Sequence, residues 1–246
     1  MIEPNLKITR KDLTDSGAIF TSAMQHIKNC LSLGGFVLLP SDTGYSVAAL
    51  AKDKEVRRTI NTLLERKLTD PISLCFANLA MVEEFICLNS VSASLLETFT
   101  PGPITVVCNV KENLPKELTS EVAGSDDRTI GVRIPDSFIE RNVASWFTKY
   151  TMTTVAVRDP LDNNKIVKDF EQAIKIVKKG MENENLRNIM WGAAVEGKEF
   201  YANQSTVVHV TGDAEKLKLV REGDISFEKI QSALGITPFW AIEEWT

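Results

Sequence analysis

The sequence predicts an α/β fold in which helices flank one mixed sheet. Short, continuous apolar runs such as residues 36–39 are typical of buried strands, and they alternate with segments whose apolar residues recur at helical spacing. No Pro- or Ser-rich linker, internal repeat or low-complexity tract divides the 246 residues. We therefore expect a single domain over residues 15–235, with an N-terminal extension at residues 1–14 and an aromatic tail, residues 236–246, docked on the domain.

The expected elements follow one another in order along the chain. The first helix begins at Asp15 and Ser16, which can cap it, and stops at Gly34-Gly35. Strands or extended segments are predicted at residues 36–39, 72–76, 104–110, 129–134, 151–157, 205–210 and 217–220. Helices are predicted at residues 53–65, 78–86, 90–98, 137–148, 168–180 and 226–234. Residues 192–204 are expected to form a loop, either an ordinary surface connection or a gate over the site.

Composition limits the classes of function. With a net charge of −5 the chain has no global positive field to attract nucleic acid or anionic membrane, so any polyanion site must be a local pocket of Arg and Lys. No apolar run approaches the roughly 20 residues that cross a bilayer, and the N-terminus lacks a signal-peptide pattern. We expect a soluble, cytoplasmic protein. The four cysteines lie in apolar stretches without a CxxC pair, so free buried thiols are expected and a metal site is not.

Five short segments place polar groups or tight turns at the ends of apolar strands, where ligand sites of α/β folds gather. They are residues 40–45, 65–72, 101–106, 131–135, and 205–208 together with 220–225. Arg133 is the most informative residue, because an arginine inside an apolar strand is costly to bury unless it meets an anion. Alone, the first segment is equally typical of an Asx or Ser/Thr turn, and the cations of the second are equally typical of a helix end.

Taken together and in this order, the segments resemble the YrdC/Sua5 family, which also includes YciO and YwlC. Members carry P-T-D/E-T-x-Y-G, K-x-R-P-x-x-x-P-L, P-G-P-x-T, V-R-x-P, S-A-N, S-T-V-V-D and R-x-G motifs, and six of the seven have a counterpart here. The resemblance implies an open, twisted sheet around a concave basic cleft. It also implies synthesis of threonylcarbamoyl-AMP from threonine, bicarbonate and ATP with Mg²⁺, a step toward threonylcarbamoyladenosine in tRNA.

The resemblance assigns roles position by position. Substrate-binding positions are matched by Ser41, Thr43, Tyr45, Arg133 and Ser205, and nucleotide-binding positions by Arg66, Asp70, Thr129, Thr154 and Arg221. The residues expected to stabilise the reacting charges are Arg66, Lys67 and Arg133. No metal-ligand set is expected in the protein, because Mg²⁺ is expected to arrive with ATP.

The phosphate-binding segment departs from the family pattern. Leu64 stands where the family has a lysine, two residues before Arg66, and Lys67 approaches from a different angle. Loss of a cation beside phosphates would lower the rate by orders of magnitude. Further motif positions carry Ser46, Cys75 and His209.

The S-A-N motif is the least well matched. Val155 and Val157 stand where Ser and Asn belong, although a one-residue shift would offer the hydroxyl of Thr154. Arg158-Asp159 follows and would bring a new cation and carboxylate to the cleft. The pattern suits a diverged family member.

Three functions are consistent with these residues. The first is a threonylcarbamoyl-AMP synthase or a close variant. The second is a noncatalytic paralogue that binds nucleotide, tRNA or double-stranded RNA, although the acidic balance of the chain weakens an RNA mode. The third is a different acyl or carbamoyl adenylate chemistry on the same scaffold. The sequence leaves the oligomeric state open.

Overall fold

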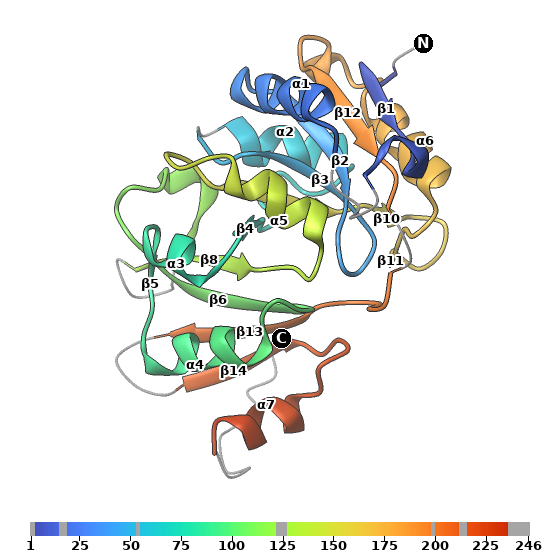
Figure 1. The fold of residues 1–246 in the computed structure, drawn as a ribbon. Helices are drawn as coiled ribbons and strands as arrows, with labels where there is room; N and C mark the ends of the chain where they lie inside the picture. Colours follow the sequence, from blue (N-terminus) through green and yellow to red (C-terminus); the bar gives the residue numbers. More distant parts are fainter. Residues whose placement is uncertain are drawn as a thin grey trace.

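The computed structural model describes residues 3–14, 19–52, 55–121, 127–197, 200–211 and 216–235. Within these ranges twelve strands form one mixed sheet with helices on both faces (Figure 1), which confirms the predicted α/β architecture. Asp15, Ser16 and the aromatic tail, residues 236–246, lie outside the described residues. The predicted caps and the docking of the tail therefore stay predictions.

The central path of the sheet contains ten strands in spatial order. They are β1 (Leu6–Ile8), β12 (Trp191–Val195), β2 (Phe36–Pro40), β3 (Tyr45–Leu50), β9 (Met152–Ala156), β4 (Ser73–Cys75), β8 (Arg128–Arg133), β6 (Ile104–Val110), β13 (Thr206–Thr211) and β14 (Lys216–Arg221). Two short strands, β5 (Ile86–Cys87) and β7 (Ser120–Glu121), pair with β6 and β8. β1–β12, β12–β2, β4–β8 and β13–β6 are parallel pairs, and the remaining pairs are antiparallel.

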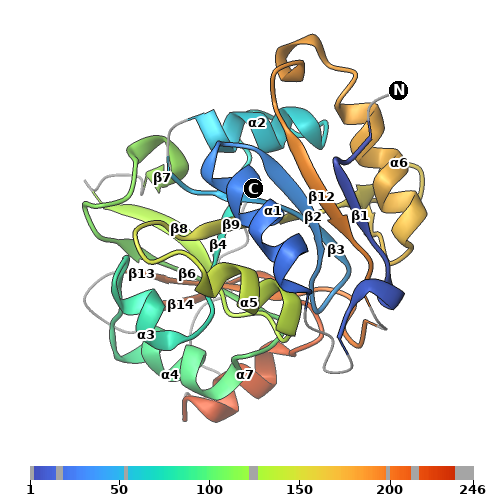
Figure 2. The same ribbon diagram turned by 45° about the horizontal axis from the view of Figure 1, so that its top comes forward.

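Two helices cover one face of the sheet. α1 (Thr21–Ser32) and α5 (Phe138–Ser145) lie over the same side in Figure 2, and their buried side chains share a core with Leu39, Leu50 and Met152. These helices form because Ile27 and Leu31 on α1, and Ile139 and Val143 on α5, recur at helical spacing and are buried against the strands.

The opposite face is covered by the other helices. α2 (Glu55–Leu63) and α6 (Phe170–Gly180) pack over β2 and β3. α3 (Leu79–Glu83), α4 (Ser90–Phe99) and α7 (Phe227–Ala233) pack over β4, β6, β8 and β13.

The segment at residues 192–204 was predicted to be a loop, and this prediction is wrong for its first part. Trp191–Val195 forms the buried strand β12 between β1 and β2. Its small residues have a packing reason, because a Cβ on Gly192 would lie 2.3 Å from Sγ of Cys30 on α1. The sequence reading took small residues as a loop signal, whereas here they allow a helix to approach a strand closely.

Two further strands of the central path, β3 and β1, were not predicted either. β3 follows directly after the turn at residues 41–44, so it was not separated from that turn in the sequence. β1 lies within residues 1–14 and pairs with β12, so the segment expected as an extension contributes an edge strand to the main sheet.

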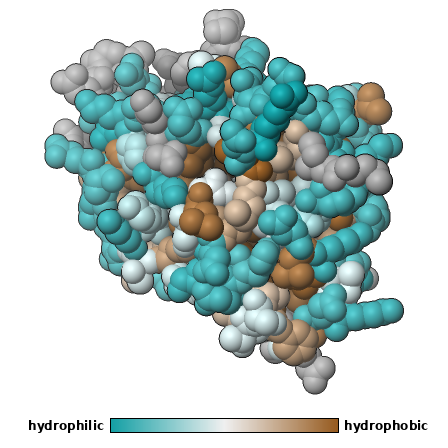
Figure 3. Space-filling model, turned by 90° about the horizontal axis from the view of Figure 1, so that it is seen from above, coloured by the Kyte–Doolittle hydropathy of each residue, from teal (hydrophilic) through white to brown (hydrophobic). Residues whose placement is uncertain are grey.

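The surface agrees with a chain in which 25% of residues are charged. Seen from above, hydrophilic side chains cover most of the face, and hydrophobic residues show between them toward the middle (Figure 3). Among the described residues, no helix combines the length and the apolar character needed to span a membrane.

The contact between α2 and α6 gives a test of this packing. A Cβ on Gly180 would lie 1.8 Å from the carbonyl oxygen of Leu63, so we expect Gly180→Ala to destabilise the fold by about 1–3 kcal/mol. Without that contact, Gly→Ala in a helix would stabilise by up to about 1 kcal/mol. Urea unfolding measures the difference, with Lys175→Ala, at an exposed position of α6, as the control. A stabilised Gly180→Ala variant would contradict the packing.

Candidate functional site

The turn between β2 and β3 is buried and rich in hydroxyls. Ser41, Asp42 and Thr43 are 6%, 1% and 1% exposed, and the N–H of Ser41 donates to the carbonyl of Gly44 at 2.8 Å. A hairpin made of β10 (Arg158–Asp159) and β11 (Lys165–Ile166) packs directly on this turn. Gly44 has φ 154°, and a Cβ there would lie 2.5 Å from Cγ2 of Ile166. Glycine therefore lets the hairpin and the turn meet.

Asp42 forms a buried ion pair with Arg133 of β8. Nη2 of Arg133 lies 2.5 Å from Oδ1 of Asp42, and the two side chains are 9% and 0% exposed. The second carboxylate oxygen accepts from the backbone N–H of Asp136 at 3.2 Å. The sequence reading expected Arg133 to meet an anion, and Asp42 is that anion here. Nε of Arg133 is buried without a hydrogen-bond partner among the described residues.

Glu140 of α5 places a second carboxylate beside this pair. It is 0% exposed, and among the described residues neither carboxylate oxygen has a hydrogen-bond partner. Burial raises the pKa of Glu140 to about 7, while Arg133 and the nearby hydroxyl of Ser41 oppose the shift. Ser137 positions the helix, because its hydroxyl donates to the carbonyl of Pro40 at 2.7 Å and accepts from the N–H of Glu140 at 3.3 Å.

The sequence reading missed Asp42 as a site residue and did not notice Glu140. A signal for Glu140 existed, because it shares the apolar face of its helix with Val143 and Ala144, three and four residues on. A carboxylate on such a face needs an explanation. Asp42 stood inside a recognised turn, but its partner lies 91 residues away in the sequence.

Arg66 and Asp70 lie together where the chain leaves α2 for β4. The guanidinium of Arg66 donates to Oδ1 of Asn61 at 3.0 Å and to the carbonyl of Pro71 at 2.9 Å, and its Nε lies 3.6 Å from Oδ2 of Asp70. Burial lowers the pKa of Arg66, Asp70 opposes this shift, and Arg158 adds to it by repulsion. Lys67 is exposed and forms no ion pair within the described part of the chain.

Ser205 and Arg221 also come together. Nη2 of Arg221 donates to the carbonyl of Ser205 at 2.8 Å and to its hydroxyl oxygen at 3.0 Å, and the hydroxyl of Thr105 donates to the same oxygen at 3.2 Å. Burial lowers the pKa of Arg221 to about 10, with repulsion from Arg158 and Arg133 as further causes. The pKa of Arg221 therefore depends on the charges of Arg133 on β8 and of Arg158 on the hairpin after β9.

The strand register shows which face of the sheet each side chain of the altered S-A-N segment points to. Thr154 lies opposite Ser73 and Ala48, and it is close enough to affect the pKa of Glu140. Val155 points the other way and packs against the cores under α2 and α4. Thr154, in the shifted register, thus supplies the hydroxyl on the side of the site.

Two predicted residues have structural contacts of their own. Tyr45 is 1% exposed, its ring packs against Phe170 and Phe200, and its hydroxyl accepts from the N–H of Gly197 at 3.0 Å. The structure does not bring this side chain to the polar side of the turn. Thr129 is 3% exposed and lies on the same face of β8 as Arg133, with its hydroxyl 3.4 Å from the carbonyl of Ser120.

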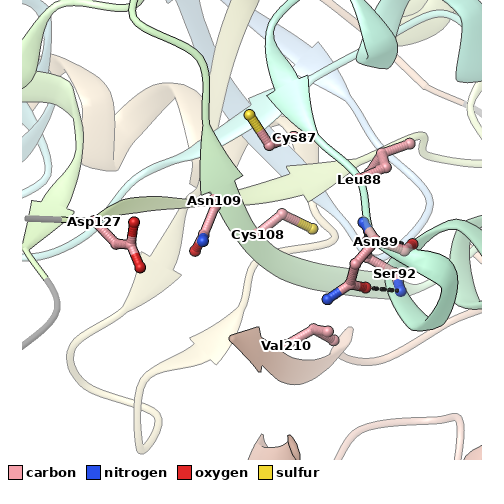
Figure 4. A pocket seen from close by; sticks show the side chains of 8 residues that line it. All are labelled: Cys87, Leu88, Asn89, Ser92, Cys108, Asn109, Asp127 and Val210. Atoms are coloured by element: carbon pink, nitrogen blue, oxygen red, sulfur yellow. Dashed lines mark hydrogen bonds between the residues drawn. The ribbon is translucent and has the colours of Figure 1, made fainter. Parts of the chain in front are cut away.

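A separate pocket of about 400 Å³ lies where β5, β6 and α4 meet (Figure 4). It is lined by Cys87, Leu88, Asn89, Ser92, Cys108, Asn109, Asp127 and Val210. None of the predicted site residues lines it. In the described ranges no cluster of three His, Cys, Asp or Glu residues could hold a metal ion.

The buried Glu140 makes folding stability depend on pH. Its folded-state pKa lies above the ordinary value of 4.5, so the favourable contribution of the neutral form is fully present below about pH 4.5 and is lost as pH rises through about 7. Glu140→Gln removes this dependence. We expect the difference in unfolding free energy to shift in favour of the variant by on the order of 3 kcal/mol between about pH 4 and pH 8.

Urea unfolding across this pH range measures the shift. Glu97→Gln, at an exposed position on α4, is the matched control for the loss of one carboxylate. If the difference in unfolding free energy between Glu140→Gln and the wild type does not change with pH, the pKa of Glu140 is not raised in the folded protein, and this account of Glu140 is wrong.

Sequence comparison relates the chain to known proteins. The Sua5/YciO/YrdC family model, described as "Telomere recombination", matches residues 29–223. A putative threonylcarbamoyl-AMP synthase of Methanocaldococcus jannaschii is 24% identical over 84% of this chain and 88% of its own length. The threonylcarbamoyl-AMP synthase of Mus musculus is 30% identical over 52% of this chain, and the match spans 44% of the mouse protein.

Solved structures share the fold. Sua5 of P. abyssi, crystallised with L-threonine, superposes with a TM-score of 0.71 at 19% identity, over 94% of this chain and 60% of that one. YciO of E. coli superposes with a TM-score of 0.69 at 20% identity, over 91% of this chain and 97% of that one. From the extent of the family match and these shared folds, the chain belongs to the Sua5/YciO/YrdC family.

Proposed function

We propose that this chain makes threonylcarbamoyl-AMP from ATP, threonine and bicarbonate, and so acts in the pathway to threonylcarbamoyladenosine in tRNA. One observation carries the proposal. The hydroxyl-rich turn at residues 41–44 lies beside Arg133, whose Nε has no partner among the described residues. The charge of the half-buried Arg158 lowers the pKa of Arg66 and of Arg221 by repulsion. The relatives named threonylcarbamoyl-AMP synthase, and the P. abyssi Sua5 crystallised with L-threonine, support it.

The reaction requires two bonds to form. The amino group of threonine attacks the carbon derived from bicarbonate, and water leaves to give the N-carboxylate. An oxygen of that carboxylate then attacks the α-phosphorus of ATP, and pyrophosphate leaves with the electron pair of the broken P–O bond. Both steps depend mainly on positioning anions and on neutralising phosphate charge.

The residues of the chain suit these tasks. Arg133 would bind the threonine carboxylate, with Ser41 and Thr43 supplying hydroxyls beside it, and Ser205 would close the substrate side. Arg66 and Arg221 would bind phosphates, because a guanidinium offers paired donors that match phosphate oxygens. Mg²⁺ would arrive bound to the phosphates and would reduce their charge.

The remaining roles rest on the family resemblance. Lys67, Asp70, Thr129 and Thr154 stay predicted catalytic or nucleotide-binding residues, and Tyr45 stays a predicted substrate-binding residue whose contacts in the structure support the turn from the core. Cytoplasmic location and binding of tRNA or double-stranded RNA also stay predictions.

Pyrophosphate release tests the reaction. The purified chain with ATP, Mg²⁺, threonine and bicarbonate should release pyrophosphate only when threonine and bicarbonate are both present. Arg133→Lys keeps the charge but loses the paired donors, so we expect kcat/KM to fall on the order of 10²-fold. Arg187→Lys, at an exposed position, should leave the rate unchanged.

The Mus musculus threonylcarbamoyl-AMP synthase serves as the positive control. If it turns over while high concentrations of this chain release no pyrophosphate, the proposed reaction is wrong. Nucleotide binding without turnover would favour a noncatalytic paralogue, and release that depends on another amino acid would favour a related adenylate chemistry.

A further inference from the structure

Arg158 stands at the start of a tightly built hairpin. The N–H of Lys165 donates to the carbonyl of Asp162 at 2.9 Å, and the two residues between them, Asn163 and Asn164, have φ values of 48° and 55°. These two asparagines end the five-residue loop, residues 160–164, that joins β10 to β11. Asparagine tolerates a positive φ better than most residues. The sequence Asp-Asn-Asn-Lys therefore encodes a turn that fixes the hairpin on which Arg158 lies.

The hairpin is joined to the candidate substrate turn by backbone hydrogen bonds. The N–H of Val157 donates to the carbonyl of Tyr45 at 2.8 Å, and the N–H of Tyr45 donates to the carbonyl of Val167 at 2.9 Å. Ile166 packs on Gly44, as described above. The position of Arg158 is thus set relative to the hydroxyls at residues 41–43.

Arg158 is half-buried and has no carboxylate partner within the described residues. Its Nη1 donates to the carbonyl of Asn164 at 2.7 Å, which orients the guanidinium without neutralising its charge. The adjacent Asp159 is engaged elsewhere, because its carboxylate accepts from the N–H of Leu161 at 2.8 Å and from Nε2 of Gln172 at 2.5 Å.

The strand register brings Arg158 to the same end of the sheet as Arg66. β9 and β4 run antiparallel with Thr154 opposite Ser73, so the chain leaving β9 toward Arg158 passes the chain entering β4. Arg66 binds the carbonyl of Pro71 in that entering segment. Leu64 packs against the core and supplies no cation at this end, whereas Arg158 does.

The charge balance of the three arginines points to an anion. The charge of Arg158 lowers the pKa of both Arg66 and Arg221, and for Arg66 this agrees with the strand register. Among the described residues, Asp70 at 3.6 Å from Arg66 is the one carboxylate within 4 Å of any of the three. Half-buried cations that repel one another are stabilised by a ligand with several negative oxygens.

We propose that Arg158 is a phosphate-binding residue that forms, with Arg66 and Arg221, a three-arginine site for the triphosphate of ATP. The inference rests on the proposed function for the identity of the ligand, but its physical content is a polyphosphate site. A guanidinium held by a single carbonyl keeps donors for two phosphate oxygens.

Calorimetric titration of MgATP and of tripolyphosphate into the full chain tests this role. Arg158→Ala should weaken the Kd of both probes by about 10-fold or more, the loss of one charge-assisted contact. Arg158→Lys keeps the charge, so its Kd values should lie between those of the wild type and of Arg158→Ala. Arg187→Ala, which removes an exposed arginine, should change neither Kd. Thermal unfolding of each variant establishes that it is folded before titration.

Two results would overturn the assignment. One is equal affinity of the wild type and of both Arg158 variants for tripolyphosphate, and the other is no binding of either probe by the wild type at about 1 mM. Failure of the proposed reaction is distinguishable. A chain that binds tripolyphosphate through Arg158 but releases no pyrophosphate with threonine would contradict the synthase function and leave the phosphate site standing.

Discussion

Asp42 and Arg133 come from elements far apart in the sequence, and their buried ion pair holds the β2–β3 turn against the middle of the sheet. Two charges removed from water are stable only if close geometry and further hydrogen bonds offset their desolvation. Here the distance is 2.5 Å, and the backbone N–H of Asp136 completes the carboxylate. The hydroxyl of Ser137 then ties the start of α5 to the end of β2. The polar side of the site depends on this set of contacts.

The same pair explains why a second buried acid is tolerated. If Glu140 stays protonated, the charges of Arg133 and Asp42 balance each other. Ionisation of Glu140 would add an uncompensated negative charge in a region of low dielectric constant. An anionic ligand at Arg133 would therefore favour the protonated form, so under the proposed function proton uptake at Glu140 and binding of a carboxylate would be thermodynamically linked.

A large part of the fold follows from local patterns. Strands such as β2 and β6 are continuous apolar runs, and α6 carries Phe170, Ile174 and Val177 on one face, so hydrophobic periodicity identifies them. β12 was not predicted, because Gly192 was taken as a loop residue. Its small size is instead required by the close contact with Cys30 on α1, which is distant in the sequence. Packing reasons of this kind are not visible in the local sequence.

In the candidate site, too, some residues follow from local motifs, whereas their contacts follow from the fold. Ser41, Thr43, Arg66 and Arg133 stand in motifs, so they were identified from the sequence. The Asp42–Arg133 contact and the proposed site of Arg66, Arg158 and Arg221 depend on strand order and on side-chain direction. Arg158 was noticed as an unusual cation, but only the β10–β11 hairpin and the register of β9 against β4 show where it lies. Long-range contacts thus decide what local motifs leave open.

A double-mutant cycle on Asp42→Asn and Arg133→Met tests most directly whether the buried ion pair organises the site. Urea unfolding of the wild type, both single variants and the double variant gives the coupling free energy between the two side chains. Either single change leaves a buried charge without its partner, so we predict losses of about 3–5 kcal/mol for each and a coupling of about 2 kcal/mol or more. Additive losses, with a coupling near zero, would contradict the account.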